Sequence, residues 1–218
     1  GASWTLILSL YVEQGLAERG LQLYTRMIKD GVRADGWTFV VLFQACGAIS
    51  RKEQSSVLLD TSSLEIGSLL HLVADAKGFT SDSYVGSTLL SMYGKCRDIN
   101  EAEDVFRNMQ EHNVVSWSVM ISAYVEQGQA EKALKLYRQM LEEGIKPDSV
   151  TFIVILAACS RVGLSHESER FFESMSKEYG VPPMLQHRAC MVDLLGRIGQ
   201  VDKAIEMIRK MPGLPNVV

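Results

Sequence analysis

Cysteine and histidine side chains, the commonest metal ligands and nucleophiles, are spread too widely along this chain to predict a site. Successive cysteines are 50, 63 and 31 residues apart and form no Cys-x-x-Cys pair; they are Cys46, Cys96, Cys159 and Cys190. No His-x-Glu is followed by Cys-x-x-Cys, so the zinc deaminase signature is absent, and no phosphate loop or nucleophile elbow occurs. We therefore expect reduced, packed cysteines, with no catalytic residue, metal or cofactor.

A second set of polar side chains has the spacing of a repeated unit. Thr5 and Ser118 are 113 residues apart, and so are Asp35 and Asp148. Hydroxyl and carboxylate groups can hydrogen-bond the edge of a nucleobase. The meaning of these residues depends on the elements that position them.

The spacing of 113 residues relates two copies of one segment. Laid over 114–148 without a gap, residues 1–35 are identical at sixteen of thirty-five places, including Tyr-Val-Glu-Gln-Gly at 11–15 and 124–128. Chance does not produce this agreement. The chain therefore contains internal repeats, which are the signature of a stacked architecture.

The second copy has the pattern of two helices. Residues 115–126 are mostly apolar, and Gly128 then interrupts the helix. From Ala130, apolar residues recur at helical spacing and predict one buried stripe, and Gly144 and Pro147 end the segment. Two such helices cannot bury both apolar faces on each other, so neighbours must stack on either side. We predict an all-α fold, an α-solenoid of helix–turn–helix repeats wound as a right-handed superhelix.

The same punctuation divides the whole chain into six units. Their ranges are 1–35, 36–82, 83–113, 114–148, 149–184 and 185–216, and 217–218 would begin another. The second unit is overlong, and its excess near 51–62 predicts an insertion that projects as a surface loop.

These motifs resemble the pentatricopeptide repeat family. Val-Val-Ser-Trp at 114–117 and Gly-Ile-Lys-Pro-Asp at 144–148 are typical of it, and the alternating unit lengths resemble its plant PLS subclass. By this resemblance 1–35 and 114–148 are P repeats, 36–82 and 149–184 are L repeats, and 83–113 and 185–216 are S repeats. The array resembles the part of an RNA-editing factor that ends just before the C-terminal extension domains.

The resemblance implies one RNA base per repeat. The base is read by the residue at position five, counted with the first residue of each unit as position one, and by the last residue of the unit. Three pairs follow in P and S repeats: Thr5 with Asp35, Ser87 with Asn113, and Ser118 with Asp148. The first and third would select guanine and the second adenine, giving 5′-G-N-A-G-N-N-3′. The L repeats carry Val40 and Ile153, which cannot hydrogen-bond a base, and the last unit, Ala189 with Asn216, is left unassigned.

Residues alone also permit a simpler interpretation of these positions. An Asp or Asn at the end of a unit is a good N-cap for the next helix. Asp35, Asp82 and Asp148 would be assigned to capping without the resemblance, and the two roles can coexist.

Positions two, five, nine and thirteen share one face of the first helix, which we expect to line the concave side and face a ligand. At position two, Tyr84, Val115 and Val150 could pack against bases, although a core role fits them equally. At position thirteen, Lys95, Arg161 and Arg197 could contact phosphates or be merely solvated, whereas Glu13 and Glu126 would repel RNA. Trp4 and Trp117, at position four, are expected to pack between helices.

Composition limits the partners. The net charge is −4, from 22 basic and 26 acidic residues, so binding to nucleic acid through charge alone is disfavoured. The longest apolar runs are too short to cross a bilayer, and we expect no membrane contact.

The function implied by the resemblance is target recognition on single-stranded RNA for organellar C-to-U editing or other RNA processing, in a chloroplast or mitochondrion. A deaminase fused downstream or supplied in trans, or an editing cofactor protein, would be the protein partner. The alternative is a helical scaffold whose groove binds a peptide or partner protein.

Overall fold

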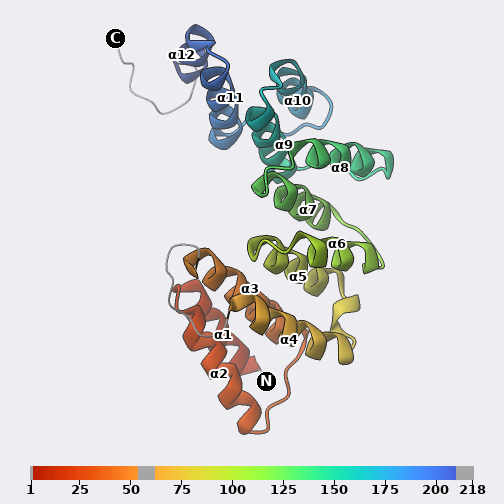
Figure 1. The fold of residues 1–218 in the computed structure, drawn as a ribbon. Coiled ribbons are helices and arrows are strands. Elements are labelled where there is room, and N and C mark those ends of the chain that lie inside the picture. Colours follow the sequence, from red (N-terminus) through yellow and green to blue (C-terminus); the bar gives the residue numbers. More distant parts are fainter. Residues whose placement is uncertain (1, 54–61, 210–218) are drawn as a thin grey trace. The chain divides into compact units, whose positions relative to one another are not determined.

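The computed structural model describes residues 2–53 and 62–209, which form α-helices and one 3-10 turn with no strand among them (Figure 1). The expectation of an all-α fold is confirmed. In chain order the elements are α1 (Ala2–Glu13), α2 (Ala17–Lys29), α3 (Gly36–Glu53), α4 (Ser63–Ala76), η1 (Phe79–Ser81), α5 (Ser83–Lys95), α6 (Ile99–Asn108), α7 (Val114–Glu126), α8 (Ala130–Glu142), α9 (Ser149–Val162), α10 (Ser165–Lys177), α11 (Leu185–Arg197) and α12 (Val201–Arg209).

Glycines end these helices where the pattern predicted a break. Gly128, after α7, has φ 75°, and Gly144, after α8, has φ 77°. Both lie in the left-handed region that is open to glycine without steric cost. Arg97 has φ 63° at the equivalent place after α5 and is the one described non-glycine residue with positive φ.

The helices form two compact units, Gly1–Ala123 and Tyr124–Val218. In the first, α3 packs against α1, α2, α4 and α5. It is apolar around most of its surface and buries Phe39, Leu42 and Phe43 completely. In the second, α9 packs against α8, α10 and α11, with Phe152 and Ile155 fully buried. First helices therefore form the centre of each unit and lie beside one another.

The amphipathic stripe predicted for the second helix of 114–148 is present. Ala130, Ala133, Leu134, Tyr137 and Met140 are all buried in α8. The rest of the helix surface carries the exposed charged side chains. Burial of one stripe on the neighbouring first helix, rather than intrinsic helix propensity, is what holds such a helix in place.

Two expectations about packing residues are also met. Trp117 is fully buried, with its ring 4.9 Å from that of Phe106 between centroids, and Trp4 is half-buried. Cys46 and Cys159 are buried and all four cysteines are free. Burial raises the pKa of the Cys159 thiol to about 12.

The first residues assigned to the predicted insertion belong to a helix. Helix α3 continues through Arg51 to Glu53, because no glycine or proline interrupts it there. Residues 54–61 lie outside the described part of the chain. Ser62 then caps α4 through a capping box with Glu65. No described helix is both long and apolar enough to cross a bilayer.

Candidate nucleic-acid interface

The acidic residues at the ends of the units cap the helices that follow them. Asp35 Oδ1 accepts hydrogen bonds from the backbone N (2.8 Å) and the Oγ1 (2.6 Å) of Thr38 in α3. Asp148 Oδ1 accepts the same two bonds from Thr151 in α9, both at 2.8 Å. The capping interpretation is confirmed at both positions. Each cap satisfies a backbone donor that a helix start leaves without an intrahelical partner.

Asn113 caps α7 in a closely related way. Its Oδ1 accepts from Ser116 N at 3.0 Å, and Ser116 Oγ donates to the Asn113 carbonyl at 2.9 Å. Asp82 instead accepts from Tyr84 N and Val85 N at the start of α5. Asn216 lies outside the described residues.

The hydroxyl residue three places after Asp35, Asn113 and Asp148 completes each cap, a role that was not predicted from the sequence. These residues are Thr38, Ser116 and Thr151. The signal was present in the sequence, because Asp-Gly-Trp-Thr, Asn-Val-Val-Ser and Asp-Ser-Val-Thr share one spacing, that of a capping box with a hydroxyl in place of its Glu or Gln. The Thr38 hydroxyl bond holds the pKa of the Asp35 carboxyl below its usual value, since it stabilises the ionised form.

The predicted partners Thr5 and Asp35 meet through Thr38. Thr5 Oγ1 lies 3.4 Å from Thr38 Oγ1, whose proton is donated to Asp35. Thr5 is therefore the donor in the first contact, and the three side chains form a short relay from α1 to the start of α3. The relay links the residues of one predicted pair across two repeats.

Position five was expected to lie on the surface, but it is buried. Thr5, Ser87 and Ser118 are only 4–5% exposed, and the Thr5 hydroxyl faces Thr38 of the neighbouring first helix α3. The Ser87 hydroxyl donates to the Ser83 carbonyl within its own helix at 2.7 Å. Ser118 belongs to the first compact unit and Asp148 to the second, so each is described only within its own unit.

Position two, in contrast, is exposed in every unit where its side chain is described. Tyr84, Val115 and Val150 are 50–55% exposed, so the core role considered for them is wrong. Trp37 occupies the same position in the second unit and is 53% exposed. Trp37 was not among the residues predicted to contact bases, although its place in the repeat is visible in the sequence. An exposed position two gives each of these first helices an uncharged contact surface.

The three candidate phosphate-binding cations already have intramolecular contacts. Lys95 lies with its side chain over Gly47 of α3, where an added Cβ would come within 2.8 Å of Lys95 Cδ. Arg161 donates to the Val125 carbonyl, and Arg197 pairs with Asp193 at 2.9 Å. Both arginines remain exposed and Lys95 half-exposed, so RNA would have to compete for or share these groups.

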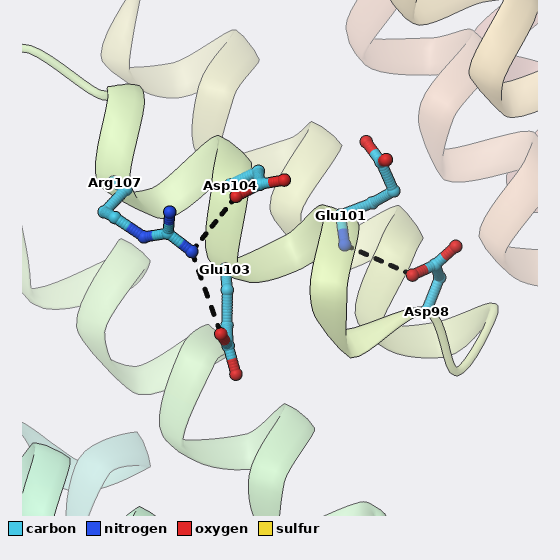
Figure 2. A network of polar contacts seen from close by, with 5 residues as sticks. All are labelled: Asp98, Glu101, Glu103, Asp104 and Arg107. Carbon is cyan, nitrogen blue, oxygen red and sulfur yellow. Dashed lines mark hydrogen bonds and ion pairs between the residues drawn. The ribbon is translucent and has the colours of Figure 1, made fainter.

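Acidic side chains gather on a second helix, α6. Figure 2 shows Asp98 capping this helix at Glu101 N (3.2 Å), and Arg107 near Asp104 (3.0 Å) and Glu103 (3.9 Å). Such exposed pairs add little stability. Their placement nevertheless puts part of the chain's negative charge on a second helix, which carries none of the residues predicted to read bases.

Nothing in the described residues groups three or more His, Cys, Asp or Glu side chains as a metal site would require. The polar side chains that lie close together are the capping residues and their hydroxyl partners, and these groups form hydrogen bonds.

Comparison with family models gives matches along most of the chain. The model described as PPR repeat family matches residues 112–161, and the model described as PPR repeat matches 2–32, 87–114, 150–179 and 190–214.

Related sequences carry the corresponding name. A putative pentatricopeptide repeat-containing protein of Arabidopsis thaliana is 37% identical over 99% of this chain and 25% of its own length. Another from Arabidopsis thaliana, named as mitochondrial, is 37% identical over 98% of this chain and 31% of its own length. The chain thus spans about a quarter to a third of these relatives.

Solved structures share the fold. The pentatricopeptide repeat protein PPR10, in complex with an 18-nucleotide psaJ RNA element, aligns over 99% of this chain and 29% of its own, with a TM-score of 0.65 and 21% identity. The PPR domain of Arabidopsis thaliana protein-only RNase P 1, in complex with tRNA, covers 93% of this chain and 98% of its own, with a TM-score of 0.64 and 14% identity.

Proposed function

This chain belongs to the pentatricopeptide repeat family, and on that basis we propose that it binds single-stranded RNA with one base per repeat. We assign it to the PLS subclass, as the target-recognition segment of an organellar factor for C-to-U editing or other RNA processing. Deamination would be carried out outside this segment, by a domain in cis or a protein in trans. Relatives named as mitochondrial favour an organelle.

The observation that carries the proposal is that each cap uses only one side-chain atom of the residue that we propose to read a base. Every capping bond that the side chains of Asp35, Asn113 and Asp148 accept is accepted by Oδ1. Within the described residues, no hydrogen bond involves Oδ2 of the aspartates or Nδ2 of the asparagine. A residue can therefore cap its helix and still offer a base an acceptor, from Asp, or a donor, from Asn.

This difference between Asp and Asn supports the proposed code. A carboxylate oxygen accepts from the guanine amino group, whereas an amide nitrogen donates to a ring nitrogen of adenine. The pairs Thr5 with Asp35 and Ser118 with Asp148 then favour guanine, and Ser87 with Asn113 favours adenine. The cap fixes the orientation of each side chain before RNA arrives, which lowers the entropic cost of binding.

The test is a titration of the 218-residue chain against a short RNA carrying G-N-A-G and against the same RNA with G and A exchanged. We expect at least a tenfold preference for the first, about 1.4 kcal/mol. The double variant Asn113→Asp with Asp148→Asn should prefer the RNA in which the third and fourth bases are exchanged. Both substitutions keep an Oδ1 for capping, so the fold should be retained.

Asp82→Asn is the matched control, because Asp82 also caps a helix but shares its repeat with Val40, which cannot hydrogen-bond a base. This change should leave the preference unaltered. Equal and steeply salt-dependent binding to both RNAs would mean phosphate contact without reading, and the code would be wrong.

A helical scaffold for a protein partner is the second candidate. The exposed carboxylates of Glu13 and Glu126, at position thirteen where a phosphate contact was expected in other repeats, favour it. Absence of binding to either RNA at low salt would support this function instead.

A further inference from the structure

A hydroxyl side chain at position three of a unit occurs only after the units that we assign to base reading. Among the five units that are followed by another, three are assigned, and each is followed by a threonine or serine there: Thr38 after Asp35, Ser116 after Asn113, and Thr151 after Asp148. The other two have an apolar residue at position five. They end at Asp82 and Met184, and position three after them is Val85 and His187. This distribution connects the hydroxyl with reading.

In the two aspartate units the hydroxyl and the aspartate are joined by a closed pair of hydrogen bonds. Asp35 N donates to Thr38 Oγ1 at 3.3 Å, and Thr38 Oγ1 donates to Asp35 Oδ1 at 2.6 Å. The same pair joins Asp148 and Thr151, at 3.2 Å and 2.8 Å. In both units Oδ1 also accepts from the threonine amide. Two donors on Oδ1 hold both torsions of the aspartate side chain.

The asparagine unit uses its hydroxyl differently. Ser116 Oγ accepts from Asn113 N at 3.1 Å and donates to the Asn113 carbonyl at 2.9 Å. Asn113 Oδ1 therefore receives its capping bond from Ser116 N and not from the hydroxyl. The direct hold of the hydroxyl on the side chain is confined to the aspartate units, where guanine is expected.

Asp82 shows that a helix can be capped without this hydroxyl. Its Oδ1 accepts from Tyr84 N at 2.9 Å and from Val85 N at 3.1 Å, two successive amides at the start of α5. The helix start is satisfied by backbone donors alone. The hydroxyls of the other units are therefore available for a role beyond capping.

Burial keeps the threonine hydroxyls away from any bound RNA. Thr38 is 1% exposed and Thr151 is fully buried, whereas Asp35 is exposed and Asp148 half-buried. An effect of either threonine on base preference must therefore pass through the aspartate. A side chain that is already held in its bound orientation binds roughly 2- to 12-fold more tightly than one that must be ordered. A base that does not fit the held carboxylate gains nothing, so the gain becomes selectivity.

We propose that Thr38 and Thr151 are positioning residues for base reading, which set the guanine preference of the units ending at Asp35 and Asp148. This inference rests on the proposed RNA-binding function. It places a determinant of each guanine in the repeat that follows the reading pair, so the pair does not define selectivity by itself.

The test measures the penalty for a wrong base at two separate places. Wild-type chain, Thr38→Val and Thr151→Val are titrated against the G-N-A-G RNA and against two RNAs with adenine in place of the first or the last guanine. In the wild-type chain each exchange should weaken binding about tenfold. Thr38→Val should reduce the penalty at the first base to about threefold or less and keep the penalty at the last base. Thr151→Val should do the opposite. A general loss of stability would weaken binding to all three RNAs alike.

Two further variants separate the hydroxyl from side-chain size and from hydroxyls elsewhere. Thr38→Ser keeps the hydroxyl and should keep the wild-type penalty at the first base. Thr88→Val is the matched control, because Thr88 donates to the Tyr84 carbonyl within its own helix. This change should leave both penalties unaltered.

The second unit permits the converse experiment. Val40→Thr gives it, with Asp82, the residue pair of a guanine reader, and the added change Val85→Thr supplies the hydroxyl. Both valines are buried and close to threonine in size. Against RNAs with guanine or adenine at the second base, Val40→Thr alone should prefer guanine by less than about threefold and the double variant by about tenfold.

The outcomes separate this inference from the function on which it rests. If the wild-type chain shows no penalty at either guanine, the code is rejected and the positioning role with it. If the wild-type chain shows both penalties and the two threonine-to-valine variants retain them, the positioning role is wrong and the code stands. The same conclusion follows if Val40→Thr alone reaches the full preference for guanine.

Discussion

Replacement of Thr38 by valine tests the capping relay at the start of α3. The change removes a hydroxyl that is 1% exposed and donates to Asp35 Oδ1 at 2.6 Å, while keeping the size and branching of the side chain. A hydrogen bond to a charged group contributes roughly 1.5–3 kcal/mol. Asp35 is exposed, so water replaces part of that bond, and we expect a loss of about 1–2 kcal/mol.

The assay is urea unfolding at pH 7, followed by circular dichroism. With a slope of roughly 2 kcal/mol per molar urea, the midpoint should fall by about 0.5–1 M. The control is Thr88→Val: Thr88 donates to the neutral Tyr84 carbonyl at 2.9 Å within its own helix. Its loss should shift the midpoint by much less.

The pH dependence of the Thr38→Val effect gives a second criterion. The Thr38 bond lowers the folded-state pKa of Asp35, so its stabilisation is fully present above the unfolded-state pKa, about 3.9. It is lost as pH falls through the lower folded-state pKa. The gap between wild type and Thr38→Val should therefore narrow below about pH 4. Equal midpoints for Thr38→Val and wild type at pH 7, or a gap of constant size down to pH 3, would refute this account of the relay.

Three further predictions concern packing, backbone and thiol chemistry. Gly67→Ala should lower the free energy of unfolding by about 1–3 kcal/mol, because its Cβ would lie 2.2 Å from the buried Met92 Sδ. The urea midpoint measures this loss, and an unchanged midpoint would show that the contact relaxes freely. Arg97→Gly should stabilise the chain by about 1 kcal/mol in thermal unfolding by removing a non-glycine residue at φ 63°, and a lower melting temperature would contradict this. Cys159 is buried, and its pKa is raised to about 12. At pH 8 it should react with a thiolate-specific alkylating reagent far more slowly in the native chain than in urea, as followed by mass spectrometry. Equal rates would be inconsistent with its burial.

Much of the secondary structure could be derived from the sequence because the signals are local. The stripe from Ala130 to Met140 and the break at Gly128 depend on residues within a few positions of each other. The helix ends at Gly128 and Gly144 were correct for the same reason. Helix α3 extended beyond its predicted end because Arg51 to Glu53 contain no stop signal, and only the next described segment, from Ser62, shows where a new helix begins.

The helix caps of the predicted site also depend on residues that are close in sequence. Capping by Asp35, Asn113 and Asp148 could be anticipated, because a cap involves a residue and the amide three positions later. The partner hydroxyls at Thr38, Ser116 and Thr151 were equally local, and their regular spacing would have revealed them.

The sequence by itself determined the helices, the caps and, through its resemblance, the family. The tertiary structure alone decided that Thr5 is buried against Thr38, that position two is exposed, and that Trp37 stacks on Tyr84. These contacts join residues 33 and 47 positions apart on neighbouring first helices. Periodicity shows which side of a helix is apolar, but the packing of one helix on the next decides which residues of that side meet and which stay in solvent.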